Sequence, residues 1–366
     1  MEKIFTKEMS NLGRQRELDL AKGLAIIFMI WVHVNEIYQA EAVEGGVYSR
    51  IIEFIGSPPA APIFMMMLGV GIVYSRKSTA EFLFKRGILF IILGYGLNFF
   101  RDTVPCYILG VMQNDPSYLA DGWELLWGTD ILPFAGLAFI FFALVKKFNI
   151  KNQIIFIIWC IFATLNILLR GKGFDNSIIN GAARLFWGTD DYSWFPFLTW
   201  ITFPILGYYF GQILIRCKDK DVLYKNILIY TGAISIPLWI TSYINDIRFG
   251  AFGELYQTEY YQHEIIGAII LGVFALFWIS ICYFASKHIS EKIHNIMGRW
   301  SRNTNIMYCV HQLILGALLL VLEELAYMPK ELFIIFICVF IATDLISIAI
   351  NKIKDKKNNI ELAINN

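Results

Sequence analysis

Long apolar stretches separated by short polar segments occupy most of the chain. A helix of about 20 mostly apolar residues crosses the hydrocarbon core of a bilayer. The segment 102–113 is short and contains Pro105, so we expect an interfacial or re-entrant piece there. The pattern predicts an all-α, polytopic transmembrane helical bundle of about ten spans, at residues 18–38, 60–75, 83–100, 130–146, 154–169, 195–215, 226–245, 264–285, 303–322 and 331–350.

The charged residues between these spans alternate in character along the chain. Lys and Arg gather before the first span and after the second, fourth, sixth, eighth and tenth spans, whereas the other loops are acidic or mixed. Because basic residues collect in cytoplasmic loops, both termini are predicted to be cytoplasmic. We expect a single membrane domain over residues 1–366, with a cytoplasmic N-terminal segment at 1–17 and a cytoplasmic basic tail at 351–366.

The composition agrees with a chain that lies mostly in lipid. Charged residues make up 17% of the chain, against about 25% in soluble domains, so we expect no sizeable soluble domain. The formal net charge of +1 does not suggest a nucleic-acid partner. None of the six cysteines forms a Cys-x-x-Cys pair, so we expect neither a disulfide framework nor a metal site. The first apolar run lacks a following cleavage site and is expected to stay in the mature protein.

The first span carries ionisable residues that are costly in lipid and usually face the interior of a bundle. Lys22 and His33 are eleven positions apart, close to three helical turns, so they share one face about 16 Å apart along the axis. Asp19 and Glu36 fall near the same stripe. Two interpretations stay open for each: Lys22 snorkels to the headgroups or faces the interior, and His33 is a hydrogen-bonded core histidine or a reactive one.

The ninth span has a second polar face. Asn305, Tyr308 and His311 (or Gln312) recur at helical spacing. This face either holds two helices together by hydrogen bonds or contributes to a site. The sequence contains no signature of a nucleophilic Ser or Cys with an adjacent base, no phosphate-binding Gly-rich loop and no His-x-x-x-His spacing. If the protein is an enzyme, an intramembrane histidine is therefore the expected acid–base group.

A short motif occurs twice outside the spans. Leu-Trp-Gly-Thr-Asp at 126–130 and Phe-Trp-Gly-Thr-Asp at 186–190 both follow apolar segments. Trp is common at the membrane interface, and Gly-Thr-Asp suits a turn or a helix cap. The repeat is consistent with two interfacial caps or with a shared role in a site.

The segment from Arg16 to Ile26, taken with His33, resembles the opening of polytopic membrane acyltransferases. These are the acyltransferase-3 family and the bacterial relatives of heparan-alpha-glucosaminide N-acetyltransferase. Lys22 stands where the family typically has Arg, and His33 falls at the expected spacing. Three further segments are similar to family segments and extend the likeness over most of the chain: 61–69, 128–137 and 298–311.

The sequence departs from these relatives in two places. Lysine at position 22 lacks the planar five-donor fork with which arginine binds a phosphate or carboxylate through two parallel hydrogen bonds. The first outer loop lacks the His-rich, Trp-Gly segment of the animal glucosaminide acetyltransferase. The site residues of that enzyme are therefore not carried over to this chain.

The resemblance implies transfer of an acyl group, usually acetyl from cytoplasmic acetyl-CoA, to an extracytoplasmic sugar or glycan of the cell envelope. The protein is then a multi-pass cell-membrane enzyme whose partners are the bilayer, acyl-CoA and the glycan, with a homo-oligomer also allowed. No metal is implied. The residues expected at the site are His33 and His311 for catalysis, Lys22, Arg76, Arg86 and Arg299 for CoA, and Asp130, Asp190, Asn305 and Tyr308 for the acceptor.

Two other classes of function stay open. Ten spans with buried ionisable groups also suit a transporter or flippase, although no inverted repeat is evident. A catalytically silent relative that senses or scaffolds is the second alternative, because of the lysine at position 22. Binding of acetyl-CoA separates an acyltransferase from a transporter.

Overall fold

The computed structural model describes residues 4–251 and 260–364, with side chains up to residue 356. These residues form helices, with only two isolated β-bridges between loop segments. The α-helices are α1 (Arg16–Tyr38), α2 (Val47–Gly56), α3 (Ala61–Tyr74), α4 (Ala80–Asn98), α5 (Val104–Gln113), α6 (Ser117–Leu126), α7 (Ile131–Lys147), α8 (Asn152–Leu169), α9 (Ser177–Arg184), α10 (Phe197–Trp200), α11 (Thr202–Leu214), α12 (Lys220–Ile244), α13 (Ile265–Ser286), α14 (Glu291–Arg302), α15 (Thr304–Leu318) and α16 (Pro329–Ile364).

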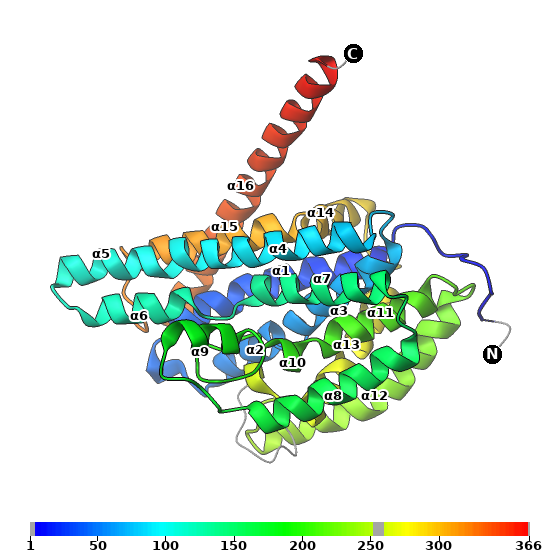
Figure 1. Cartoon of the computed structure of the whole chain (residues 1–366), viewed down its shortest axis with the longest axis horizontal. Helices are drawn as coiled ribbons and strands as arrows, with labels where there is room; N and C mark the ends of the chain where they lie inside the picture. The colour runs from blue at the N-terminus through cyan, green and yellow to red at the C-terminus, as the bar shows by residue number, and fades with distance from the viewer. Residues whose placement is uncertain (1–3, 252–259, 365–366) are drawn as a thin grey trace.

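The predicted fold class is confirmed. Within the described residues, nine helical segments are long and apolar enough to cross a membrane, and α15 is a shorter apolar helix at the predicted ninth span. The ten predicted ranges all fall on helices. The last span is longer than expected, because α16 continues to Ile364 and projects beyond the bundle (Figure 1).

The segment 102–113 is not a separate piece of chain, as a re-entrant segment would be. A π-helical turn, η2 (Phe99–Thr103), joins α4 to α5 in one continuous helix from Ala80 to Gln113. The Val104 N–H bonds to the carbonyl of Phe99, five residues back. This wider turn accommodates Pro105 in the first turn of α5 without ending the helix.

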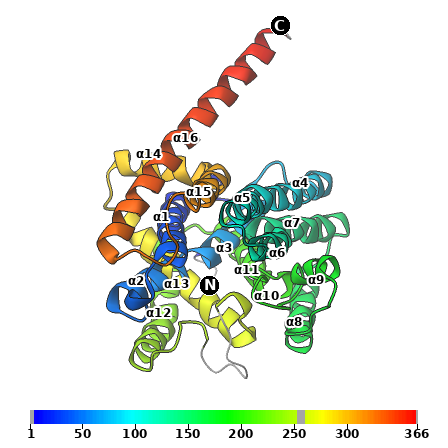
Figure 2. The same ribbon diagram turned by 90° about the vertical axis from the view of Figure 1, so that its left-hand side faces the viewer.

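Helix α1 is the centre of the site-bearing half of the bundle. It packs against α2, α3, α13, α14, α15 and α16, and Figure 2 shows these helices around it. Helices α4 and α7 form a tight pair beside this group, as do α3 and α11. Glycines allow α3 and α11 to pack this closely. A Cβ on Gly69 would lie 1.9 Å from the Pro204 carbonyl oxygen, and a Cβ on Gly207 would lie 1.9 Å from the Met66 carbonyl oxygen.

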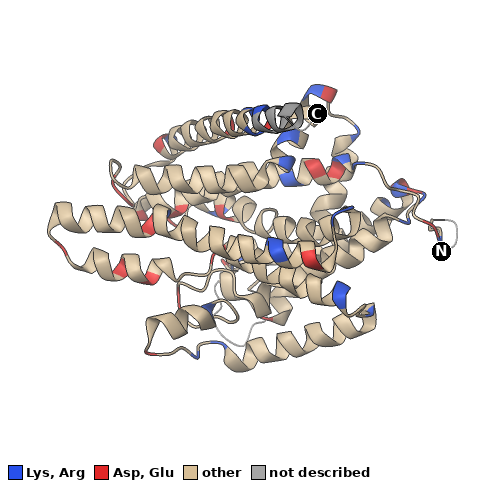
Figure 3. Ribbon diagram, turned by 45° about the horizontal axis from the view of Figure 1, so that its top comes forward, with Lys and Arg blue, Asp and Glu red and all other residues tan. Residues whose placement is uncertain are grey.

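The two ends of the bundle differ in charge. Most Lys and Arg lie toward the end nearer the N-terminus, whereas the opposite end carries mainly Asp and Glu (Figure 3). The N-terminal segment is fastened at the first end, where Thr6 N–H bonds to the Arg216 carbonyl and Lys218 N–H to that of Ile4. We call the end at which α3, α7, α11 and α13 finish the basic end, and the opposite end the acidic end.

Candidate functional site

Helices α1 and α15 bring the two intramembrane histidines together. His33 Nδ1 lies 2.9 Å from His311 Nε2, although 278 positions separate them in the sequence. The rings are nearly parallel, with an interplanar angle of 3° and centroids 5.2 Å apart. His311 is fully buried, whereas His33 is partly accessible from a cavity. The pair is therefore one hydrogen-bonded unit with a single accessible ring.

The backbone decides where the protons of this pair lie. His311 Nδ1 is 2.9 Å from the Met307 carbonyl oxygen, which only accepts, so this nitrogen carries a hydrogen. In a neutral ring His311 Nε2 is then an acceptor, and His33 Nδ1 donates to it. Gln312 Nε2 also lies 3.1 Å from His33 Nδ1. Because Nδ1 carries the hydrogen in the neutral pair, the Gln312 amide pairs with it only when turned so that its oxygen accepts. In the neutral pair His33 Nε2 consequently has a free lone pair and is the basic atom.

A buried ion network lies beside the histidines. Arg101 contacts Asp130 at 2.6 Å and Asp102 at 2.7 Å, and all three side chains are at most 13% exposed. The Tyr308 hydroxyl donates to Asp130 at 2.5 Å, from the helical turn before His311. Asp130 also caps α7 by accepting from the Ile131 N–H. One arginine thus serves two carboxylates, and the cluster is anionic when both are ionised.

Arg101 and Asp102 are among the site residues that the sequence patterns did not single out. The charge pattern placed Asp102 in an outer loop, but it lies in the π turn η2 inside a continuous helix. A π turn changes the direction of the side chains that follow it and is frequent at functional sites. Helix α15 packs directly on this turn, because a Cβ on Gly316 would lie 2.3 Å from the Arg101 carbonyl oxygen. An Arg-Asp pair interrupting an apolar run was the available signal.

A cavity of about 320 Å³ opens at the acidic end, next to His33. We call it the acidic-end cavity. It combines polar groups with aromatic walls, which is typical of small-molecule sites. Two of its lining residues are paired, because the Tyr261 hydroxyl donates to Glu36 at 3.0 Å. Its remaining lining includes His33, Arg101, Asp102, Asp130, Trp194, Phe195 and Gln312.

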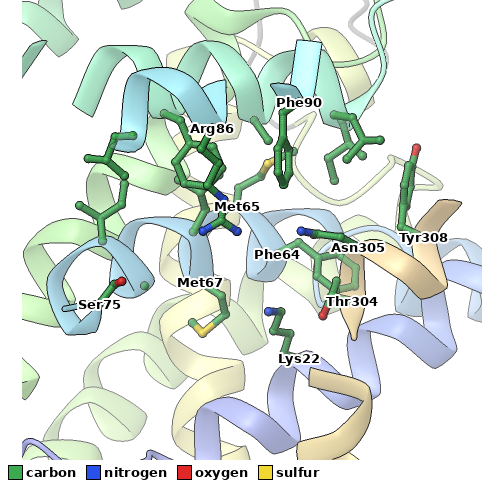
Figure 4. A pocket seen from close by; sticks show the side chains of 18 of the residues that line it. Lys22, Phe64, Met65, Met67, Ser75, Arg86, Phe90, Thr304, Asn305 and Tyr308 are labelled. Carbon is green, nitrogen blue, oxygen red and sulfur yellow. The ribbon is translucent and has the colours of Figure 1, made fainter. Parts of the chain in front are cut away.

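A second cavity, of about 210 Å³, lies on the basic-end side of the histidine pair. We call it the basic-end cavity. Lys22 and Arg86 enter it from opposite walls, and Figure 4 places Ser75 and Tyr308 at its two ends. Lys77 adds a third cation at the mouth. Apart from these groups the walls are largely apolar, so the cavity suits a ligand with an anionic part and an apolar part.

A small cavity of about 30 Å³ lies between the other two, and we call it the junction. It shares Met29, Phe64, Ile131 and Tyr308 with the basic-end cavity. It shares His33, Phe195 and Tyr261 with the acidic-end cavity. The three spaces therefore follow one another along α1, and His33 lies where the junction meets the acidic-end cavity.

The structure separates the four cations that were expected to bind CoA. Lys22 and Arg86 line the basic-end cavity. Arg76 follows α3, is exposed and is not part of its lining. Arg299 is paired with Asp344 of α16, which also accepts from the Trp300 indole. Only two of the four predicted cations therefore share a binding space.

The four residues expected to bind the acceptor are also divided. Asp130 lines the acidic-end cavity, and the Tyr308 hydroxyl donates a hydrogen bond to the Asp130 carboxylate. Asn305 lines the basic-end cavity instead. Asp190 lines neither, because it is bound by Arg184, at 2.7 Å. Among the described residues, no three His, Cys, Asp or Glu side chains come together as metal ligands.

The repeated Trp-Gly-Thr-Asp motif has two different structural roles. Asp130 of the first copy caps α7 and joins the buried ion network. Asp190 of the second copy pairs with Arg184, which also contacts Glu124 at 2.7 Å. Burial lowers the pKa of the Arg184 guanidinium, but hydrogen bonds to these two carboxylates raise it above its usual value. The second copy thus ties α9 to α6, away from the cavities.

Comparison with known proteins agrees with this architecture. The model of a family described as an acyltransferase domain matches residues 15–352, which include all three cavities and both histidines. Comparisons with curated proteins and with solved structures gave no match. The matched span covers nearly the whole chain, and the protein therefore belongs to the acyltransferase-3 family of membrane acyltransferases.

Proposed function

We propose that this membrane acyltransferase moves an acetyl group from cytoplasmic acetyl-CoA to a sugar or glycan on the far side, with His33 as the general base. The observation that carries the proposal is the row of three cavities along α1. A cationic space and an anionic, aromatic space lie on either side of the junction, and His33 lines both the junction and the anionic space. This is the arrangement that transfer between a donor and an acceptor from opposite sides requires.

The basic-end cavity suits the donor. Lys22, Lys77 and Arg86 supply positive charge for the phosphates of CoA, and the apolar walls suit its pantetheine arm. Lys22 acts as a point charge where the family typically has arginine, so it contributes attraction without a bidentate fork. Asn305 belongs to this donor side, where its amide offers a further hydrogen-bonding group.

The acidic-end cavity suits a polyol or amino-sugar acceptor. Asp102, Asp130 and Glu36 accept hydrogen bonds from hydroxyl or amino groups, and Trp194 and Tyr261 provide flat apolar surfaces. Arg101 and Tyr308 hold Asp130 in one orientation. Asp190 and Arg299 take no part in this proposal, because both are bound elsewhere.

The chemistry is a direct acyl transfer. His33 Nε2 takes the proton from the attacking hydroxyl or amine as the new bond forms to the thioester carbonyl carbon. The carbon–sulfur bond breaks, and the proton passes to the departing thiolate. His33 becomes a cation during this step, and His311 stabilises it by accepting the hydrogen bond from His33 Nδ1. His311 is thus a positioning residue, because its own Nδ1 hydrogen is held by Met307.

Replacement of His33 by Ala tests the proposal. Membrane vesicles containing the full chain are given radiolabelled acetyl-CoA, and label fixed to acid-insoluble envelope material is counted. We expect the variant to lose about 10²- to 10⁴-fold in rate. The exposed loop residue His288 provides a matched control, since His288→Ala should keep full activity. Undiminished labelling by His33→Ala would remove the proposed role.

A transporter would also need cavities that lead from one side to the other. Thermal unfolding in detergent separates the two functions. A protein that binds acetyl-CoA in its folded state unfolds at a higher temperature when acetyl-CoA is present. Stabilisation that is lost in Lys22→Gln supports the donor site, whereas no stabilisation of the unaltered protein favours transport.

A further inference from the structure

The junction is much smaller than the spaces on either side of it. Its volume is about 30 Å³, against about 210 Å³ and 320 Å³ for the two cavities on either side of it. A water-sized group needs about 10–15 Å³ by this kind of measure. The junction therefore has room for two or three such groups, which matches the carbonyl carbon, oxygen and methyl of an acetyl group.

The walls of the junction cannot easily move apart. The α2–α3 turn is packed tightly on α1, because a Cβ on Gly56 would lie 2.2 Å from the Val32 Cβ. Ala60 and Ala61, both buried, continue this wall. The Tyr260 ring also lines the junction and is fixed by its hydroxyl, which donates to the Ser57 carbonyl at 2.7 Å. Helix backbone and an anchored ring thus limit the space.

The geometry points to Met29 and Phe64 as the residues that set the length of the acyl chain. Both line the basic-end cavity and the junction, so an acyl group that moves from the donor side to His33 passes beside them. This inference rests on the proposed acyltransferase function. An acetyl group fits the junction, whereas each added methylene of a longer chain has to displace packed atoms.

Met29 and Phe64 differ from the other two residues that the spaces share. Tyr308 is held by Asp130, and Ile131 carries the backbone N–H that Asp130 caps. Met29 and Phe64 make no such polar contact, and their side chains are the adjustable part of the passage. Met29 comes from α1 and Phe64 from α3, so the two can be varied independently. Shortening either one widens the passage without touching the charged network.

The test measures acyl-chain preference in the labelling assay described above. Full-length protein in membrane vesicles is given radiolabelled acetyl-, butyryl- or hexanoyl-CoA, and the rates are compared within each variant. The ratio of two rates in one preparation is unaffected by how much protein is folded. We expect the unaltered protein to use hexanoyl-CoA at least about tenfold more slowly than acetyl-CoA. Met29→Ala and Phe64→Ala should each raise the hexanoyl-to-acetyl ratio by about tenfold.

Met67 provides the matched control. It lies on α3 one turn from Phe64 and lines the basic-end cavity but not the junction, so Met67→Ala should leave the ratio unchanged. Equal use of all three donors by the unaltered protein would overturn the inference and leave the acyltransferase function in place. An equal change of ratio in Met67→Ala would place the selection in the wider cavity and would also overturn it. Failure to transfer any acyl group would refute the function itself.

Discussion

His33 on α1 and His311 on α15 share one hydrogen bond, 2.9 Å between ring nitrogens, and the Met307 carbonyl fixes its direction. The relationship makes the two rings unequal. His33 keeps a free nitrogen beside two cavities, whereas both nitrogens of His311 are engaged. The pair is an oriented base comparable with other catalytic bases whose tautomer is set by a neighbouring group.

The orienting role of His311 is testable with two substitutions. His311→Ala removes the acceptor for His33 Nδ1, so the ring can rotate or change tautomer. We expect kcat to fall about 10²-fold with little change in the KM for acetyl-CoA. His311→Gln retains an acceptor oxygen and should restore part of the rate. Equal kcat values for the Ala and Gln variants would contradict an orienting hydrogen bond.

Lys22 should contribute to donor binding more than Arg76 does. Lys22→Gln removes a charge from the wall of the basic-end cavity, and we expect the KM for acetyl-CoA to rise about tenfold. Arg76→Gln is the control, because this residue is exposed and outside the cavity lining. Lys22→Arg supplies the planar fork and should bind at least as well as lysine. A KM that is the same in all variants would leave a silent relative as the better description.

Because α3 packs closely on α11, adding one methyl group at their contact should destabilise the folded protein. A Cβ at Gly69 would lie 1.9 Å from a backbone oxygen of Pro204, so Gly69→Ala forces the helices apart. Overpacking costs about 1–3 kcal/mol and occasionally more. Gly71, two positions along the same helix, has nothing within 4 Å of its Cβ position, so Gly71→Ala should not destabilise the protein in this way. Thermal unfolding in detergent should show a lowered transition temperature for the Gly69 variant alone.

Removing the buried cation Arg101 should destabilise the folded protein more than removing the exposed cation Lys85. Arg101→Met leaves Asp102 and Asp130 without a counter-charge in a buried site, which costs about 3–5 kcal/mol. Lys85→Met breaks an exposed pair with Glu81, and pairs of this kind are worth about 0–1 kcal/mol. Thermal unfolding should therefore separate the two variants clearly. Transition temperatures that fall equally would show that Arg101 is not needed to balance the carboxylates.

Acid should weaken the fold through His263, which lies just before α13. The ring packs on Trp200 and donates to the Tyr260 carbonyl, and burial lowers its pKa from 6.5 to about 4. A group whose pKa is lower in the folded state stabilises the protein above its unfolded pKa. That contribution is lost as the pH falls from 6.5 to about 4, and it amounts to about 3 kcal/mol.

His263→Phe should reduce this loss of stability on acidification. Unfolding measured in detergent at pH 7 and at pH 4 gives the difference for each protein. The exposed His288 is the control, and His288→Phe should keep the full dependence of the unaltered protein. An unchanged difference in His263→Phe would show that other groups carry the acid sensitivity.

The sequence by itself determined the elements and the shared face of α1. Ten apolar stretches all became helices, and Lys22 and His33 lie along one row of cavities, because helical periodicity is a local property. The resemblance to acyltransferases was also available from short motifs and is confirmed by the family match over residues 15–352.

Only the tertiary structure decided which polar residues share a space. His311 meets His33, and Arg101 turns inward at the π turn, whereas Arg299 is taken by Asp344 and Asp190 by Arg184. Each pairing joins residues on different elements, and the partner of a charged residue cannot be read from its position in the sequence. Which partner it finds depends on how helices cross and on where small residues such as Gly316 let them approach.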